Sequence, residues 1–198
     1  MAGMRDDVVY RLCDKFQFTE VINMEILEFR TPTVQYKNQA EEFKQEFFDY
    51  EETVINGSAL LDQMIYDNWL VNTLNNSSPE TVRSDWVVAN TFFVIRKADN
   101  KIIGIIDIRH NINNDFLAAY GGHIGYSVRP SERRKGYATQ MLKMALEFER
   151  TVGLEKVMLG CYSSNIASIK TIERCGGIRT EEKLYIDKKP MYVYWISL

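Results

Sequence analysis

The sequence has 198 residues, of which 45% are hydrophobic and 26% are charged, a composition typical of one globular domain with a hydrophobic core. Its 24 Lys and Arg residues and 27 Asp and Glu residues give a formal net charge of −3, which argues against general binding to nucleic acid. The three cysteines and two histidines lack metal-ligand spacing, and no apolar run is long enough to span a bilayer. We therefore expect a cytoplasmic protein with free thiols and no bound metal.

The N-terminal residues differ from the rest of the sequence. Residues 1–23 carry charge throughout and lack the apolar segment of a secretory signal peptide. From Met24 onward, the sequence MEILEFR alternates as a β-strand does. We therefore expect a domain over residues 24–198, preceded by an N-terminal extension, residues 1–23, whose role the sequence does not reveal.

Two helices are expected after this first strand. The threonines of TPT (31–33) offer hydroxyl groups that can cap a following helix. Side chains spaced four and three apart then form one face of an amphipathic helix: Tyr36, Ala40, Phe43, Phe47 and Tyr50. A second helix is predicted over 59–76, and the polar sequence NNSSPE that follows is typical of a loop.

The rest of the chain alternates strand and helix patterns. NTFFVIRK and KIIGIIDIRH flank a polar turn and predict a hairpin, and GGHIGYSV predicts a third strand. A helix over roughly 135–152, a strand KVMLGCY, a short helix in SSNIASIKTIERCGG and a final strand pair, IRTEEKLYID and PMYVYWISL, follow. This order predicts an α/β (α+β) mixed sheet with helices on its faces.

The segment SERRKGYA (131–138) brings three cations and a glycine to the start of the helix predicted over 135–152. A helix N-terminus presents unpaired N–H groups and the positive end of its dipole, and therefore binds phosphate. Gly136 lets a ligand approach the backbone, while Arg133, Arg134 and Lys135 add positive charge. Cations are unfavourable at a bare helix N-terminus, so the pattern favours a pyrophosphate site over a solvated basic surface. Neither a GxxxxGK[ST] nor a GxGxxG motif is present.

The pattern is R-x-x-G-x-A, formed by Arg133, Gly136 and Ala138, after a strand that ends in V-x-P. The sequence YSVRPSERRKGYATQMLKMALEFER resembles the acyl-CoA-binding motif of the GNAT superfamily of N-acetyltransferases. NIASIKTIERCGG resembles the helix that follows in that family, and the GGHIGY strand and NxxSxxxIExxGG helix are most similar to a bacterial subgroup. The resemblance covers Met24 to Leu198. It implies a GNAT acyl-CoA N-acyltransferase fold, with a central, twisted, mostly antiparallel sheet, splayed strands and helices on both faces.

The resemblance also implies an activity. An acetyl group would pass from acetyl-CoA to a primary amine by direct attack in a ternary complex, without a metal or a covalent enzyme intermediate. The acceptor would be a small-molecule or peptide amine. The protein would be a monomer or homodimer without nucleic-acid or membrane partners. The resemblance does not say which amine is acetylated.

The resemblance implies cofactor contacts for particular residues. The backbone of Tyr126 and Val128 would pair with the pantetheine arm as an added strand does. N–H groups before and within the first helical turn would hold the pyrophosphate. Asn165 would meet the cofactor or lock the splay of the strands, and Ser168 would lie nearby on the next turn. The alternatives are a helix N-cap for Asn165 and an exposed helix position for Ser168. The expected cofactor-binding residues are Tyr126, Val128, Arg133, Arg134, Lys135, Gly136, Tyr137, Ala138, Thr139, Asn165 and Ser168.

The catalytic acid is less clearly indicated. Many family members carry a tyrosine acid seven residues after the asparagine, where this sequence has Ile172. Tyr162 and Tyr185 are possible substitutes, and Cys161 is a third, although a strand cysteine is more often a small buried apolar residue. The missing tyrosine motivates an alternative function, a non-catalytic acyl-CoA-binding or sensor module of the same fold.

The candidate base is His123, because histidine titrates in the useful pH range. Strand alternation places His123 on the face opposite Tyr126 and Val128, unless a β-bulge occurs at Gly125. The alternative is a histidine hydrogen-bonded within the sheet.

On the preceding strand, Asp107 and Arg109 either shape the acceptor site or pair with each other.

Overall fold

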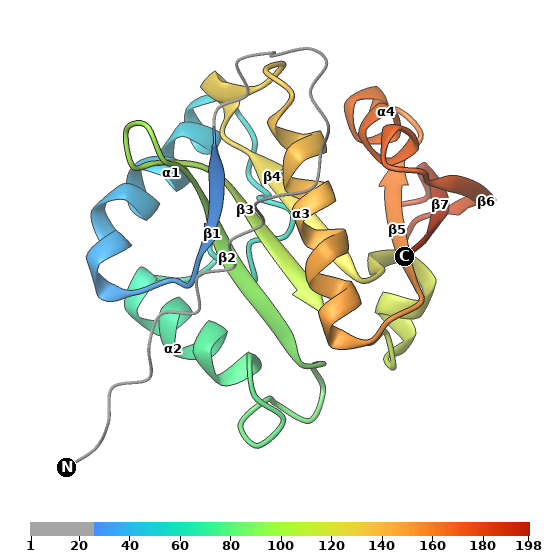
Figure 1. Ribbon diagram of the computed structural model, residues 1–198, viewed down its shortest axis with the longest axis horizontal. Coiled ribbons are helices and arrows are strands. Elements are labelled where there is room, and N and C mark those ends of the chain that lie inside the picture. The colour runs from blue at the N-terminus through green and yellow to red at the C-terminus, as the bar shows by residue number, and fades with distance from the viewer. Residues whose placement is uncertain (1–25) are drawn as a thin grey trace, which may run out of the picture.

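The structure is a computed structural model that describes residues 26–198 (Figure 1). The N-terminal extension, the expected boundary at Met24 and Cys13 lie outside the described residues. Within the described range, the elements follow the predicted order of strand, two helices, three strands, helix, strand, helix and two strands. The mixed α/β fold class is therefore confirmed.

The strands form two sheets in which every pairing is antiparallel. The first sheet has the order β1-β2-β3-β4, with β1 at Leu27–Arg30, β2 at Ala89–Arg96, β3 at Lys101–Arg109 and β4 at Ile124–Val128. The second has the order β5-β7-β6, with β5 at Lys156–Tyr162, β6 at Ile178–Leu184 and β7 at Pro190–Ser197. The adjacent strands β4 and β5 thus belong to different sheets, as the expected splay requires.

Helices cover both faces of the first sheet (Figure 1). On one face, α1 (Lys37–Asp49), preceded by a 3₁₀ turn at Val34–Tyr36, and α2 (Tyr66–Asn76) enclose a core with Phe93, Ile102 and Ile105 of the sheet. Because neighbouring isoleucines of β3 enter different cores, this strand is apolar along its length rather than alternating.

The opposite face carries α3 (Tyr137–Val152), with α4 (Ile166–Arg174) beside the second sheet. The core under α3 contains Ile103 and Ile106 of the first sheet together with Val157 and Leu159 of β5. One hydrophobic core therefore joins the two sheets across the boundary between β4 and β5.

Two expectations for the helical region are wrong. Helix α2 begins at Tyr66 rather than near residue 59, because Ala59 and Leu60 adopt left-handed backbone conformations (φ 49° and 72°), which a helix excludes. Thr33 precedes the first helical turn but makes no capping hydrogen bond with its side chain. Its carbonyl oxygen instead accepts a hydrogen bond of 2.6 Å from the Tyr66 hydroxyl, which ties the start of α2 to this turn.

Candidate functional site

Among residues 26–198, no strand pairs with one edge of β4, which we call its open edge. The Arg129 N–H donates to the Ile103 carbonyl (2.7 Å), so odd-numbered residues of β4 turn their backbone groups toward β3. The N–H and C=O groups of Tyr126 and Val128 consequently point away from β3, toward the side where β5 lies in the other sheet. This edge can accept an extended ligand as an added strand, the arrangement predicted for these two residues.

The two sheets meet at the beginning of β4. The His123 N–H donates to the Met158 carbonyl (2.8 Å), and the Met158 N–H donates to Nδ1 of the His123 ring (2.9 Å). Burial, together with the positive charge of Arg109, lowers the pKa of His123 to about 4, so the ring is neutral at pH 7. These are the contacts of a histidine hydrogen-bonded within the sheet. The register of β4 with β3 is continuous at Gly125, so no bulge re-orients the strand there.

Asp107 and Arg109 pair with each other. Asp107 forms an ion pair with Nε of Arg109 (2.9 Å) and accepts a hydrogen bond from the Thr91 hydroxyl (2.7 Å). Nη1 of Arg109 donates to the carbonyl oxygens of Gly121 and Gly122 (3.2 and 3.0 Å). Arg109 thereby holds the end of the short π-helix Leu117–Gly121 immediately before His123.

The connection from β4 to α3 is an irregular loop. A 3₁₀ turn at Pro130–Glu132 is followed by left-handed conformations at Arg134 (φ 65°) and Gly136 (φ 85°), and α3 begins at the next residue. A Cβ atom on Gly136 would meet no atom of the described residues within 4 Å, so within this part of the chain the space beside the backbone is open. The first N–H groups of α3 have no acceptor within the helix, which leaves donors beside an open space at its positive end.

Two of the three cations in this loop have carboxylate partners within the protein, contrary to the expectation that a ligand anion must compensate them. Arg133 forms a two-point ion pair with Glu52 (Nη2–Oε2 2.8 Å), and its Nε donates to the Val128 carbonyl (3.2 Å). Lys135 pairs with Glu132 (2.7 Å). Arg134 is exposed and forms no ion pair with any residue in 26–198. The excess positive charge expected at this helix start is therefore smaller than the sequence predicts.

The start of α4 lies across from the open edge of β4. Asn165 is the N-cap of α4, and its Oδ1 accepts a hydrogen bond from the Ser168 N–H (3.0 Å). Ser168 is half-buried, and its hydroxyl lies 3.1 Å from the Tyr126 hydroxyl, so it is not simply an exposed helix residue. Burial raises the pKa of Tyr126 to about 12. The sequence analysis missed this role of the Tyr126 side chain, although a tyrosine between Ile124 and Val128 on an apolar strand face needs a hydroxyl partner.

Comparison with known proteins identifies the family. Residues 57–177, more than half of the chain, match the model of the acetyltransferase (GNAT) family. The chain belongs to the GNAT acetyltransferase family. The expected GNAT membership and acyltransferase class are thus confirmed, and enzymes of this family use acetyl-CoA.

Solved GNAT structures share the fold. The ribosomal-protein-S5-alanine acetyltransferase from Vibrio fischeri is similar with a TM-score of 0.66 and 17% identity, covering 96% of this chain and 97% of that one. The spermidine N-acetyltransferase from Vibrio cholerae, a dodecamer, gives 0.60 and 14%, covering 86% and 93%. The microcin C7 self-immunity acetyltransferase MccE, solved with acetyl-CoA and AMP, gives 0.62 and 17%, covering 87% and 92%. No curated protein sequence matches significantly.

In this GNAT chain, the side chain at the position of the usual tyrosine acid is buried. Ile172 is 1% exposed and belongs to the core under α3. Cys161 is buried as well, and burial raises the pKa of its thiol to about 11, in keeping with the expected small apolar residue. Ile172 has no proton to donate, and Cys161, although protonated at pH 7, is buried in the core under α3.

Tyr162 lies at the end of β5 in a group of aromatic side chains. Its hydroxyl donates to Asp187 (3.3 Å), and its ring packs edge-on against Tyr185 (centroids 5.4 Å apart). Burial and the charge of Asp187 raise the pKa of Tyr162, so the phenol stays protonated at pH 7. A protonated phenol keeps Tyr162 a candidate acid in this GNAT site.

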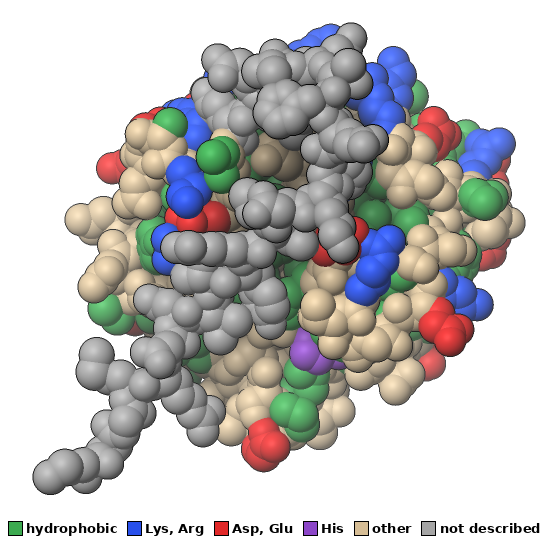
Figure 2. Space-filling model, in the orientation of Figure 1, with side chains coloured by type: hydrophobic (Ala, Val, Ile, Leu, Met, Phe, Trp, Pro, Cys, Tyr) green, Lys and Arg blue, Asp and Glu red, His purple; other side chains and the backbone are tan. Residues whose placement is uncertain are grey.

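Among residues 26–198, no helix is long and apolar enough to cross a membrane, and no group of three metal-ligating side chains occurs. On the face shown in Figure 2, basic and acidic side chains of the described residues are interspersed.

Proposed function

We propose that this protein transfers the acetyl group of acetyl-CoA to a primary amine by direct attack in a ternary complex. The observation that carries the proposal is the open edge of β4, which leads into the loop before α3. Tyr126 and Val128 offer backbone donors and acceptors that point away from β3, and the loop to the N-terminus of α3 follows. A ligand with amide groups at one end and phosphates at the other suits this sequence of contacts.

The residues of the chain would share the binding of acetyl-CoA. The amide groups of the pantetheine arm would pair with the backbone of Tyr126 and Val128. The phosphates would receive hydrogen bonds from N–H groups around Gly136, Ala138 and Thr139, and from Arg134, a cation of the same loop that forms no ion pair within residues 26–198. Asn165 and Ser168 would border the ligand at the start of α4.

The chemical step requires a neutral amine close to the thioester carbonyl, a base for the amine proton and an acid for the leaving thiolate. We propose Tyr162 as the acid, because its raised pKa keeps it protonated. For His123 we propose a positioning role instead of the base, because its Nδ1 atom is occupied by Met158 and its ring is buried. The reaction needs no metal ion.

The acceptor is proposed to be a small-molecule or peptide amine. The names of the similar structures include acetyltransferases for the S5 ribosomal protein alanine and for spermidine, so both classes belong in a first screen. In this chain the carboxylate of Glu52, near the loop before α3, is engaged by Arg133 rather than free to attract a polyamine. We therefore place peptide amines first in the screen.

The test is calorimetric titration with acetyl-CoA, CoA and ATP, followed by an assay of thiol release with peptide and polyamine acceptors. Binding of both CoA species in the micromolar range, on the order of −8 kcal/mol, without binding of ATP, is the expected result. Absence of binding by either CoA species would overturn the proposal.

The alternative is a non-catalytic acyl-CoA-binding module, favoured by the buried Ile172 at the usual acid position. Tight acetyl-CoA binding without thiol release for any amine would support this alternative. Turnover with one amine at more than about 1 s⁻¹, a typical enzymatic rate, would exclude it.

A further inference from the structure

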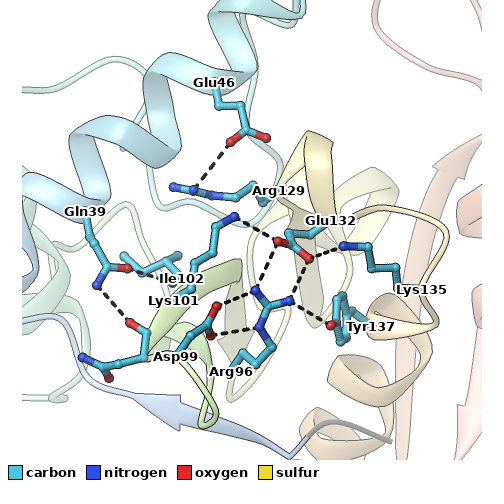
Figure 3. A network of polar contacts seen from close by, with 11 residues as sticks. Gln39, Glu46, Arg96, Asp99, Lys101, Ile102, Arg129, Glu132, Lys135 and Tyr137 are labelled. Carbon is cyan, nitrogen blue, oxygen red and sulfur yellow. Dashed lines mark hydrogen bonds and ion pairs between the residues drawn. The ribbon is translucent and has the colours of Figure 1, made fainter. Parts of the chain in front are cut away.

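The carboxylate of Glu132 is the centre of a charged network beside the loop that precedes α3 (Figure 3). Glu132 is only 4% exposed, yet its carboxylate is ionised because basic side chains surround it. Burial acts to raise its pKa, but hydrogen bonds from Lys135, Lys101 and Arg96 outweigh burial and bring the pKa down to about 2. A buried carboxylate is stable only with such partners, so its geometry is tightly determined.

The three cations come from the β2–β3 hairpin and from the loop itself. Arg96 ends β2 and Lys101 begins β3, so these two represent the β2–β3 hairpin, at 2.9 Å each from the carboxylate. Lys135 belongs to the loop itself, at 2.7 Å. Arg96 also contacts the hydroxyl of Tyr137, the first residue of α3 (3.1 Å). Glu132 therefore ties the hairpin to the residues on each side of Gly136.

The hairpin is itself fixed to α1. The amide of Gln39 donates to the Asn100 carbonyl (2.9 Å) and accepts from the Ile102 N–H (2.8 Å). Asp99 forms an ion pair with Arg96 (2.6 Å) within the same turn (Figure 3). The turn between Arg96 and Lys101, two of the cations that hold Glu132, is thus fixed to α1 by hydrogen bonds.

The loop needs an external anchor. Arg134 adopts a left-handed conformation that is unfavourable for a side chain other than glycine, and Gly136 does the same without that cost. In the first turn of the loop, Glu46 accepts a hydrogen bond from the Ser131 N–H (2.7 Å). Glu132 provides the corresponding anchor on the side of α3.

Lys135 lies at the exposed side of this network. Its ammonium group is held by Glu132 (2.7 Å), whose side chain is 5% exposed, while the Lys135 side chain itself is 50% exposed. An anion at the start of α3 could therefore reach Lys135 without breaking its contact with Glu132.

From these contacts we infer that Glu132 is a positioning residue, which holds Lys135 and the N–H groups at the start of α3 in the geometry that binds the phosphates of the cosubstrate. The inference rests on the proposed function. It assigns a favourable role to a negative charge next to an anion site. Simple electrostatics predicts the opposite, since removal of a carboxylate beside Lys135 would raise the affinity for an anionic ligand.

This contrast defines the experiment. Glu132→Gln keeps the size of the side chain and removes its charge, and Glu147→Gln is the matched control. Glu147 is exposed on α3 and pairs with Arg150 on the same helix, so its substitution changes the net charge equally. Calorimetry with CoA is expected to give about tenfold weaker binding for E132Q, a typical loss for a broken charged hydrogen bond, and unchanged binding for E147Q.

Two further measurements separate positioning from general destabilisation. Acetyl-CoA and S-acetylpantetheine, which lacks the phosphates, are compared as acetyl donors. We expect E132Q to lower kcat/KM only with acetyl-CoA, whereas general destabilisation would lower it with both donors. The variant Lys135→Met and the double variant complete a double-mutant cycle, in which the E132Q effect is expected to shrink once Lys135 is absent.

The outcomes of the proposed function and of this inference are distinguishable. If the unmodified protein does not bind CoA, both fail. If it binds CoA and E132Q binds equally well or more tightly, the proposed function stands and the positioning role of Glu132 is overturned. Additive effects in the double-mutant cycle would overturn the route through Lys135.

Discussion

Gly57 lies against Gly125 of β4 so closely that a Cβ atom on Gly57 would come within 2.1 Å of the Gly125 carbonyl oxygen. The same segment is joined to β4 by the Ser127 hydroxyl, which donates to the Asn56 carbonyl (2.8 Å). The connection between α1 and α2 therefore crosses β4 on the face opposite α3. An acceptor amine that approaches β4 from this face would meet this segment.

We expect Gly57→Ala to destabilise the protein and disturb β4. The added Cβ would collide with backbone atoms, and the residue has a φ of 69°, which costs a non-glycine residue about 1 kcal/mol. A total loss of about 2–3 kcal/mol corresponds to a fall in Tm of about 5–10 °C for a domain of this size. Thermal unfolding measures this effect, and a Tm within 1 °C of the unmodified value, roughly the resolution of such a comparison, would contradict the close packing.

His123 is expected to act on stability rather than on proton transfer. Its pKa is lowered from 6.5 to about 4, so the neutral ring stabilises the folded state above pH 6.5, and this contribution is lost as the pH falls toward 4. His123→Asn can replace Nδ1 with an amide oxygen as the acceptor for Met158, whereas His123→Ala cannot. We expect H123A to lower Tm more than H123N at pH 7.5, with a smaller difference from the unmodified protein at pH 4.5.

The pH–rate profile distinguishes this role from that of a base. If His123 only positions the strands, H123N keeps the shape of the kcat/KM profile between pH 5 and 8. A loss of about 100-fold or more in kcat, with loss of the ascending limb, would restore His123 as the base.

The sequence predicted the order of the elements because their patterns are strong. The strand KVMLGCY was predicted at 156–162, where β5 lies, because a short apolar run before the polar SSN suits a buried strand rather than a helix of usual length. The segment 59–65 misled the prediction because Leu60, Leu61, Met64 and Ile65 are spaced as on a helix. The left-handed conformations at Ala59 and Leu60 depend on tertiary contacts that this local spacing does not encode.

The loop before α3 was predicted in position but not in its partners. Arg133 pairs with Glu52, which lies 81 residues earlier, and Glu132 binds Arg96 at a separation of 36 residues. Such contacts follow from the packing of α1 and the β2–β3 hairpin around the loop, so no short-range sequence pattern predicts them. The roles of Asn165 as an N-cap and of the GG stop after α4 were predictable because capping is local.

Glu149 predicts a pH dependence of the opposite sign to that of His123. Its carboxylate is fully buried on α3 and has no hydrogen-bond partner among the described residues, and burial raises its pKa from 4.5 to about 8. Since the unfolded chain releases this proton near pH 4.5, stability falls as the pH rises from 4.5 toward 8. We expect Glu149→Gln to remove this loss and to raise Tm at pH 8, with little difference at pH 4.5. Equal Tm differences at both pH values would contradict the buried, protonated state.

Tyr162→Phe tests the proposed acid. The substitution removes the hydroxyl group that donates to Asp187 and leaves the packing against Tyr185. We expect kcat to fall by about 10²-fold, within the usual range for acid catalysis, and the calorimetric affinity for CoA to stay unchanged. Tyr185→Phe, at the other tyrosine that the sequence suggested as an acid, shows whether the effect belongs to Tyr162. An unchanged kcat for Y162F would exclude Tyr162 as the acid.

Gly136 and Gly153 provide a matched pair for the phosphate-binding loop. They flank α3 at its two ends, both have positive φ (85° and 93°), and a Cβ on either would meet nothing within 4 Å. Valine at either position therefore pays a similar backbone cost of about 1–2 kcal/mol, with a similar fall in Tm. Only Gly136→Val places a side chain beside the N–H groups at the start of α3. We expect G136V to weaken CoA binding by about tenfold or more and G153V to leave it unchanged, because a blocked approach forfeits charge-assisted hydrogen bonds to phosphate. Equal affinities for CoA in the two variants would show that no ligand approaches the backbone at Gly136.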